Sequence, residues 1–156
     1  NVRHYPYATA EIFTVRRFGE NGQVKYRLTA PYLVHYPDDD TSEVKSPTLI
    51  SYRPDGATVT VTGEQAKVTA KGETIFLWDN VSVTRAATPG RLEMVARMPD
   101  LTAQPDAGIA FTGSPVEITQ GQSWVKGVGI HIDNNNSTLV LQSQVRGQYI
   151  RPRAAP

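Results

Sequence analysis

The sequence contains no cysteine, which excludes a disulfide framework, a thiolate zinc site and a cysteine nucleophile. It also lacks any apolar run of about 18 residues, the length that a membrane-spanning helix needs. An excess of charge is missing too, since 16 basic and 15 acidic residues leave a net charge of +1. Nucleic-acid-binding proteins normally carry a clear basic excess, so we expect no nucleic-acid partner.

The residues that are present describe one folded domain. Hydrophobic residues make up 39% of the 156 positions and charged residues 20%, so the chain can bury a core and is not disordered by composition. No segment repeats its apolar residues with helical spacing over three turns, whereas alternation of apolar and polar residues recurs throughout. This pattern predicts an all-β fold.

The longest alternation runs from residue 24 to residue 36. Its apolar face consists of Val24, Tyr26, Leu28, Ala30, Tyr32, Val34 and Tyr36. Such a run predicts a strand with one buried face and one wet face. Pro31 interrupts it and has no amide proton to donate, which predicts an edge strand or a bulge. The preceding Asn21-Gly22 pair predicts a hairpin turn.

Four similar units of roughly 30 to 35 residues follow one another, which is the pattern of a stacked β-repeat. Each unit places a strand, a polar turn and a second strand between two marks: Ala30 and Pro47, Gly63 and Asn80, Ala96 and Pro115, and Gly127 and Gln144. Ordinary antiparallel proteins also alternate strands and turns at such intervals. Breaks at a shared level predict kinked strands that form a V or a boat, with two open ends where backbone groups lack partners.

Motifs for catalysis or metal binding are missing from the sequence. The three histidines are scattered, and no His-Glu-x-x-His pattern or nucleophile elbow occurs. The acidic run at residues 38–40 lacks the glycine and the terminal glutamate of a calcium-binding loop. We therefore expect no catalytic residues, no metal and no cofactor.

Seven segments together carry a resemblance to a known family. They are residues 18–30 (FGENGQVKYRLTA), 35–40 (HYPDDD), 46–49 (SPTL), 63–66 (GEQA), 79–83 (DNVSV), 114–121 (SPVEITQG) and 143–149 (SQVRGQY). In order and spacing they resemble the LptC family of lipopolysaccharide-export proteins. The resemblance extends over nearly the whole chain, from about residue 5 to residue 150.

The resemblance implies an elongated, twisted β-jellyroll of two packed antiparallel sheets with open ends. This domain is expected over residues 11–150, after a lead-in at 1–10 and before a flexible tail at 151–156. It also implies a non-enzymatic periplasmic protein, held in the inner membrane by a helix that lies before Asn1. Such a protein takes lipopolysaccharide from an inner-membrane ABC transporter at its N-terminal edge. It passes the lipid to a periplasmic bridge protein at its C-terminal edge, and edge-to-edge self-association is a further expected outcome.

Individual positions follow from the same resemblance. The two glycines important to the family fall on Gly22 and Gly113, and the edge toward the next protein falls on Val145 and Tyr149. The predicted lipid-binding groove consists of Tyr26, Leu28, Val44, Trp78, Val116, Ile130, Leu139 and Leu141. Each glycine also has a simpler interpretation as a residue that supplies backbone freedom, and each groove residue as part of the core.

Three other functions stay open on the sequence. The first is the soluble bridge subunit of the same export pathway, which has a cleaved signal in place of an anchor. The second is a carbohydrate-active enzyme on a jellyroll, which needs a pair of carboxylates at one groove. The third is an adhesive β-protein that binds no lipid at all.

Overall fold

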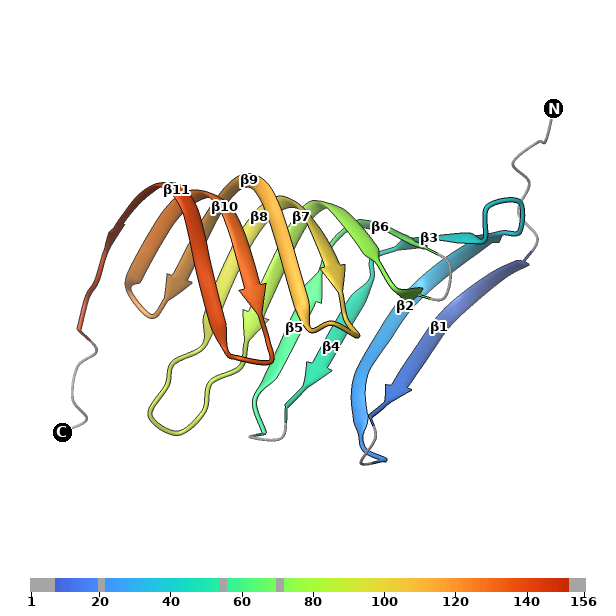
Figure 1. Cartoon of the computed structure of the whole chain (residues 1–156), viewed down its shortest axis with the longest axis horizontal. Helices are drawn as coiled ribbons and strands as arrows, with labels where there is room; N and C mark the ends of the chain where they lie inside the picture. The colour runs from blue at the N-terminus through green and yellow to red at the C-terminus, as the bar shows by residue number, and fades with distance from the viewer. Residues whose placement is uncertain (1–7, 20–21, 54–55, 70–71, 152–156) are drawn as a thin grey trace.

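A computed structural model describes residues 8–19, 22–53, 56–69 and 72–151. In these ranges the chain forms a single antiparallel system of β-strands (Figure 1). The strands are β1 (Ala8–Phe18), β2 (Val24–Tyr36), β3 (Thr41–Lys45), β4 (Thr48–Tyr52), β5 (Thr58–Thr62), β6 (Gln65–Val68), β7 (Ile75–Arg85), β8 (Met94–Gln104), β9 (Ile109–Gln120), β10 (Ser123–Asp133) and β11 (Thr138–Gln148). The predicted all-β fold is thus confirmed. Within the described ranges, no helix has the length and apolarity needed to cross a bilayer.

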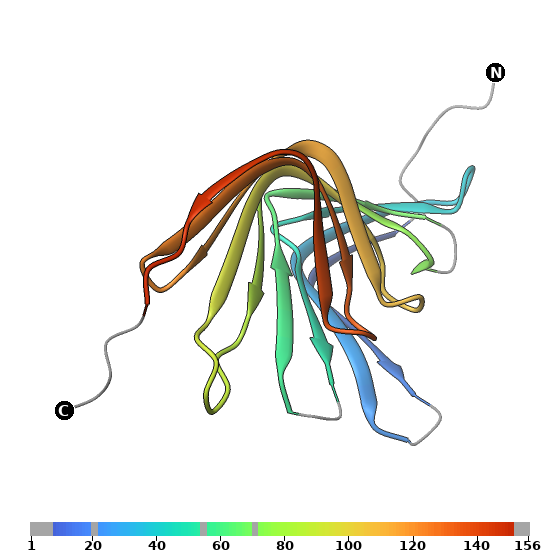
Figure 2. The same cartoon turned by 60° about the vertical axis from the view of Figure 1, so that its left-hand side comes forward.

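The strands form two walls that meet at an angle (Figure 2). We call the wall that contains β4 and β5 the first wall, and the wall that contains β3 and β6 the second wall. Strand β2 pairs with β4 through residues 26–29 and with β3 through residues 32–36, so it belongs to both walls. Strand β7 likewise pairs with β6 and with β5, and β8 to β11 continue alongside it. The long strands therefore bend from one wall into the other.

The bends lie where the sequence breaks predict them. Ser46, Asp79, Asn80 and Gln144 all have positive φ values, between 50° and 64°. The β7–β8 ladder shifts register between Trp78 and Val81, which marks a bulge at Asp79-Asn80. Since a bulge inserts unpaired residues and bends its strand, bulges at one level fold the sheet into a V. The predicted kinks at Asn80 and Gln144 are confirmed.

Side-chain hydrogen bonds brace the bend between β8 and β9. The Asp100 carboxylate accepts a hydrogen bond from Oγ1 of Thr112 and another from Oγ of Ser114, each at 2.6 Å. The β8–β9 ladder shifts register between Arg97 and Thr102, next to this carboxylate. The hydroxyls of Thr112 and Ser114 thus provide the Asp100 carboxylate with hydrogen bonds at the point where backbone pairing between the two strands is interrupted.

The core lies inside the bend, between the inner faces of the two walls. Its most deeply buried large residues are Val44, Ile75, Leu77, Val81, Leu101 and Ile130. Burying one such side chain contributes roughly 1.5–3 kcal/mol. This set draws on β3, β7, β8 and β10, so the core ties distant parts of the chain together.

Three local predictions differ from the structure. Strand β1 begins at Ala8, inside the predicted lead-in, and residues 1–7 and 152–156 lie outside the described ranges. Strand β2 is not an edge strand, because it has β1 on one side and β3 and β4 on the other. Its ladder with β4 ends at Thr29 and its ladder with β3 begins at Tyr32, so Pro31 lies in the gap between them, where no amide proton is needed. Pro31 lies where β2 passes from one wall to the other, and beyond it Tyr32 is 37% exposed instead of buried. The bend interrupts the alternation of inward and outward side chains, so residues two apart on opposite sides of the bend no longer point to the same face.

Candidate functional site

A cavity of about 580 Å³ opens between the walls, near the hairpin turns at their tips. Its volume falls within the range of about 300–1,000 Å³ that is usual for ligand sites. The first wall contributes apolar side chains from β4, β5 and β7, and the second wall contributes them from β8, β9 and β10. These apolar residues are Leu49, Val59, Val61, Val83, Ala103, Ile109, Ala110 and Ile132. The cavity continues the core outward as a groove with an apolar interior.

Polar contacts join the two walls across the mouth of this groove. Nζ of Lys25, at the start of β2, donates to the backbone carbonyl of Asp106 at 2.7 Å. Nε of Arg17 lies 3.4 Å from the carboxylate of the same Asp106. Further along, Nη1 of Arg53 donates to the backbone carbonyl of Asn134 and lies 3.3 Å from its side-chain oxygen. The groove is therefore apolar inside and polar at its rim.

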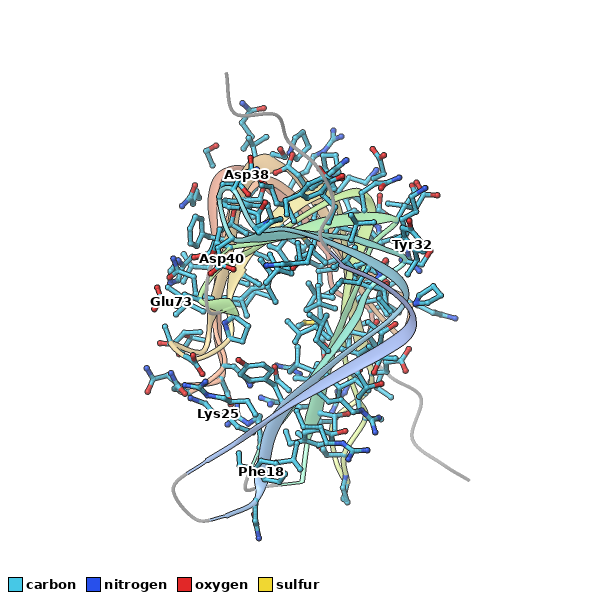
Figure 3. The ribbon with its side chains drawn as sticks, turned by 90° about the vertical axis from the view of Figure 1, so that its right-hand side faces the viewer. Phe18, Lys25, Tyr32, Asp38, Asp40 and Glu73 are labelled. Atoms are coloured by element: carbon cyan, nitrogen blue, oxygen red, sulfur yellow. The ribbon has the colours of Figure 1, made fainter. Side chains whose placement is uncertain are left out.

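Figure 3 looks into the N-terminal end of the molecule. Asp40 and Glu73 lie toward the tips of the second wall, and Phe18 lies at the tip of the first wall. Lys25 lies between these tips, in agreement with its hydrogen bond to Asp106. The groove thus has an open end on the side of β1.

Tyr26 shows how the apolar interior and the polar rim meet. Its side chain is buried in the core cluster. The pKa of Tyr26 is raised above its ordinary value, first by burial of the hydroxyl and then by the negative charge of Asp106. Arg17 acts in the opposite direction. The phenol therefore stays neutral well above pH 7, with its ring in the core and its oxygen toward the rim.

Most of the predicted groove residues lie on the inner faces of the walls. Tyr26, Leu28, Val44, Val116 and Ile130 are buried in the core cluster. Leu139 and Leu141 are partly buried and pack against that cluster from β11. None of these residues lines the 580 Å³ cavity, which lies nearer the tips. Their contact with lipid stays a prediction.

Trp78 does not lie on the inner face, and its assignment to the groove is wrong. Its neighbours Ile75 and Leu77 are 2% exposed, whereas Trp78 is 39% exposed and shares its parity with the exposed Phe76. Successive side chains of a strand point to opposite faces, so the burial of Leu77 directs Trp78 outward.

The two predicted glycines have different surroundings. Gly22 has a φ of +76° and donates its amide to the carbonyl of Gly19, so the turn requires its backbone conformation. Gly113 has no positive φ, and a Cβ built on it meets nothing within 4 Å. Gly113 instead lies between Thr112 and Ser114, the two residues that hold Asp100 at the bend.

The predicted partner edge lies on the last strand of the sheet. Among the described strands, β11 pairs only with β10, so its other side is open. Val145, in β11, is 56% exposed, and Tyr149, directly after the end of β11, is 78% exposed. At the opposite end, β1 pairs only with β2 in the described part of the chain. The sheet therefore has two free edges, and an unpaired edge can pair with another chain.

The sequence-based prediction missed the residues that line the cavity, although their parity was visible. Val59 and Val61 alternate on one face of β5, as Leu49 and Ser51 do on β4. These residues could have been predicted as the inward-pointing strand residues that lie close to a turn, because the two walls separate toward their tips. The pairing of Lys25 with Asp106 and of Arg53 with Asn134 had no local signal.

A cluster that could bind a metal ion is not found in the part of the chain that the structure describes. No group of three or more His, Asp or Glu residues there has the arrangement of a metal site. The site consists instead of an apolar cavity, a polar rim and two free sheet edges.

The geometry defines a class of protein: a V-shaped, open-ended β-jellyroll with an apolar interior. Residues 1–150 match the protein-family model described as "Lipopolysaccharide-assembly, LptC-related". The chain belongs to this LptC-related family of lipopolysaccharide-assembly proteins. A search of curated proteins gave no match.

A solved structure shares the fold. It is LptH of Pseudomonas aeruginosa, described as the LptA homologous periplasmic component of the conserved lipopolysaccharide transport device. The TM-score is 0.62 at 10% sequence identity, and the similarity covers 81% of this chain and 95% of LptH. The predicted β-jellyroll is confirmed by this likeness.

Proposed function

We propose that this chain receives lipopolysaccharide from an inner-membrane ABC transporter and passes it to the next β-jellyroll in the periplasm. Membership of the LptC-related family supports the substrate. The observation that carries the proposal is the cavity between two apolar walls, with Lys25, Arg53 and Asp106 at its rim. An amphiphile with apolar chains and a polar head fits such a site, because its chains lie inside while its head stays in water.

The groove acts as an apolar environment matched to the membrane. Each buried CH₂ group of an acyl chain contributes roughly 0.8 kcal/mol, whether a bilayer or a protein groove buries it. Transfer from membrane to groove therefore changes the free energy little. The transporter's ATP hydrolysis supplies the direction, and the protein performs no chemical step on the lipid.

The free edges provide the connections to partners. Strand β1 faces the transporter, and β11, with Val145 and Tyr149, faces the next bridge protein. Pairing of edges by β-augmentation extends one sheet into the next, so the grooves of neighbouring jellyrolls join end to end. An N-terminal helix upstream of Asn1 holds the chain in the inner membrane and places the jellyroll in the periplasm.

The test is a reconstituted transfer experiment. The full-length chain is placed with the transporter in proteoliposomes that contain lipopolysaccharide, and photocrosslinking detects the lipid on the chain and on the added bridge protein. The proposal predicts ATP-dependent crosslinks, first to this chain and then to the bridge protein. Lipid that reaches the bridge protein equally well without this chain contradicts it.

A further inference from the structure

A group of three arginines lies on the first wall, next to the cavity. Arg53 follows β4 and lines the cavity, and Arg85 ends β7. Arg85 lies opposite Val59 in the β5–β7 ladder and shares the parity of the buried Val81 and Val83. It therefore points to the groove side of the wall. Arg91 follows in the loop between β7 and β8.

Arg85 has no acidic partner among the described residues, and neither does Arg91. Nε of Arg85 is buried without a hydrogen-bond partner in that part of the chain. Its Nη2 approaches only the sulfur of Met94, at 3.9 Å. The pKa of Arg85 is lowered, first by burial of the guanidinium and then by the positive charges of Arg91 and Arg53. A half-buried cation is thus held beside two other cations.

The second wall does not cover this place. Arg53 contacts Asn134, in the turn between β10 and β11, and β11 is the last strand of the sheet. Arg85 lies two strands beyond Arg53 in the first wall, in the order β4, β5, β7. In Figure 1 the loop between β7 and β8 extends past the β10–β11 turn. Arg85 and Arg91 therefore face the part of the groove that opens to solvent.

We propose that Arg85, with Arg53 and Arg91, binds a phosphate on the head group of an amphiphile whose chains occupy the neighbouring cavity. This inference rests on the proposed function and adds the site of its charged contact. The cavity residue Val59 lies directly opposite Arg85, so one molecule can place its chains and its phosphate at adjoining positions.

The chemistry of the site favours phosphate over other anions. A guanidinium presents its N–H groups as a planar fork that matches two phosphate oxygens, and charge-assisted hydrogen bonds of this kind are strong. A dianionic head group also offsets the repulsion among the three cations.

The experiment compares bis-phosphorylated lipid A with a phosphate-free lipid A of the same acyl chains. Binding of both is measured on the wild-type protein and on Arg85→Gln, Arg85→Lys and Arg97→Gln. Arg97 lies on β8 of the same wall but on the opposite parity from the buried Ala96 and Met98, so it is the matched control on the outer face. Thermal unfolding of each variant confirms that it folds.

The proposal predicts that Arg85→Gln weakens binding of the bis-phosphorylated lipid about tenfold, a typical effect of losing one charge-assisted contact. Binding of the phosphate-free lipid stays unchanged, Arg85→Lys retains part of the affinity, and Arg97→Gln has no effect. Equal weakening of both lipids by Arg85→Gln overturns the site, because it assigns Arg85 to packing against Met94.

Two further results separate the alternatives. Inorganic phosphate alone is expected to compete only weakly, because it gains nothing from the cavity. If inorganic phosphate competes with an affinity equal to that of the lipid, the site does not recognise an amphiphile and is a general phosphate site. If the wild type binds neither lipid, the proposed function fails as a whole. If it binds both equally and Arg85→Gln changes neither, only the phosphate site is wrong.

Discussion

Lys25 and Asp106 are 81 residues apart in the sequence, and they meet across the mouth of the groove through a hydrogen bond of 2.7 Å. Lys25 belongs to the first wall and Asp106 to a turn of the second wall, so the contact holds two tips of the V together. Arg17 lies against the same Asp106. A lipid that enters the groove from the side has to displace these contacts.

Replacing Lys25 with methionine therefore changes stability and lipid entry in opposite directions. The expected loss of unfolding free energy is about 1 kcal/mol, the usual worth of one hydrogen bond. The rate of lipid association is expected to rise by up to about fivefold, which corresponds to a similar free energy. Urea denaturation and stopped-flow lipid binding measure the two effects. Lys67→Met on the outer face of β6 is the control, and an unchanged or slower association rate contradicts the prediction.

Leu139 and Val140 are neighbours on β11, and their side chains point to opposite faces of the sheet. Leu139 packs against the core cluster, whereas Val140 is 56% exposed. Leu139→Asp is expected to weaken lipid binding several times more than Val140→Asp, because only Leu139 has inward parity. Both variants should fold, since Leu139 is only partly buried. Lipid crosslinking and circular dichroism on the two variants test this, and equal lipid binding by both counts against a role for Leu139.

Leu77 and Trp78 form a second pair of neighbours on β7. Leu77→Ala is expected to lower the unfolding free energy by about 2–5 kcal/mol, because it leaves a cavity in the core. Trp78→Ala removes a larger side chain from the outer face and should cost less than Leu77→Ala. Denaturant unfolding of both variants gives the comparison. A larger loss of unfolding free energy for Trp78→Ala would show that Trp78 packs in the interior.

The turn between β10 and β11 gives a prediction on pH. Asp133 accepts hydrogen bonds from the side chain and the amide of Asn136 and from the amide of Asn135. The side-chain bond from Asn136 has the largest part in lowering the pKa of Asp133 below its ordinary value of 3.8. A depressed carboxyl pKa contributes stability that is present above about pH 4 and is lost as the pH falls through the lower, folded-state value. Asp133→Asn should therefore lose less of its urea midpoint between pH 5 and pH 2.5 than the wild type does, and an equal loss in both proteins contradicts this.

The open edge of β11 gives a prediction on association. Val145→Lys places a charge on the free edge, which is a common means of blocking edge pairing. We expect it to reduce binding to the next bridge protein, and any self-association of the chain, without a change in thermal stability. Leu92→Lys, in the loop between β7 and β8, is the matched control on an exposed apolar residue. Sedimentation and pull-down measurements decide the matter, and undiminished pairing in Val145→Lys would exclude β11 as the edge.

Much of the fold could be predicted from the sequence, because alternation and turn residues act locally. The burial of Tyr26, Leu28 and Ala30 follows the predicted parity of β2. The breaks at Asn80 and Gln144 coincide with positive φ values, which asparagine and polar residues adopt more readily than β-branched ones. The resemblance to the LptC family, read from scattered short motifs, agrees with the family match over residues 1–150.

The errors lie where an alternation is ambiguous or a strand bends. Around Trp78 the run Ile75-Phe76-Leu77-Trp78 is apolar on both faces, so the sequence gives no period from which to choose the buried one. At Tyr32 the bend after Pro31 changes the parity, and a shift of one residue moves a side chain to the other face. The cavity depends on how far the two walls separate, which is set by contacts between Lys25, Arg53 and turns that lie far along the chain. Such contacts leave no local pattern.

The most direct test of the account places a photocrosslinking residue at Val59 and, separately, at Thr60, which are adjacent on β5. Val59 lines the cavity, and Thr60 has the opposite parity. A lipid-filled groove predicts a crosslink to lipopolysaccharide from Val59 and none from Thr60, in proteins with the same folded circular dichroism spectrum. Equal crosslinking from both positions, or none from Val59 with lipid in excess, contradicts a lipid-filled groove.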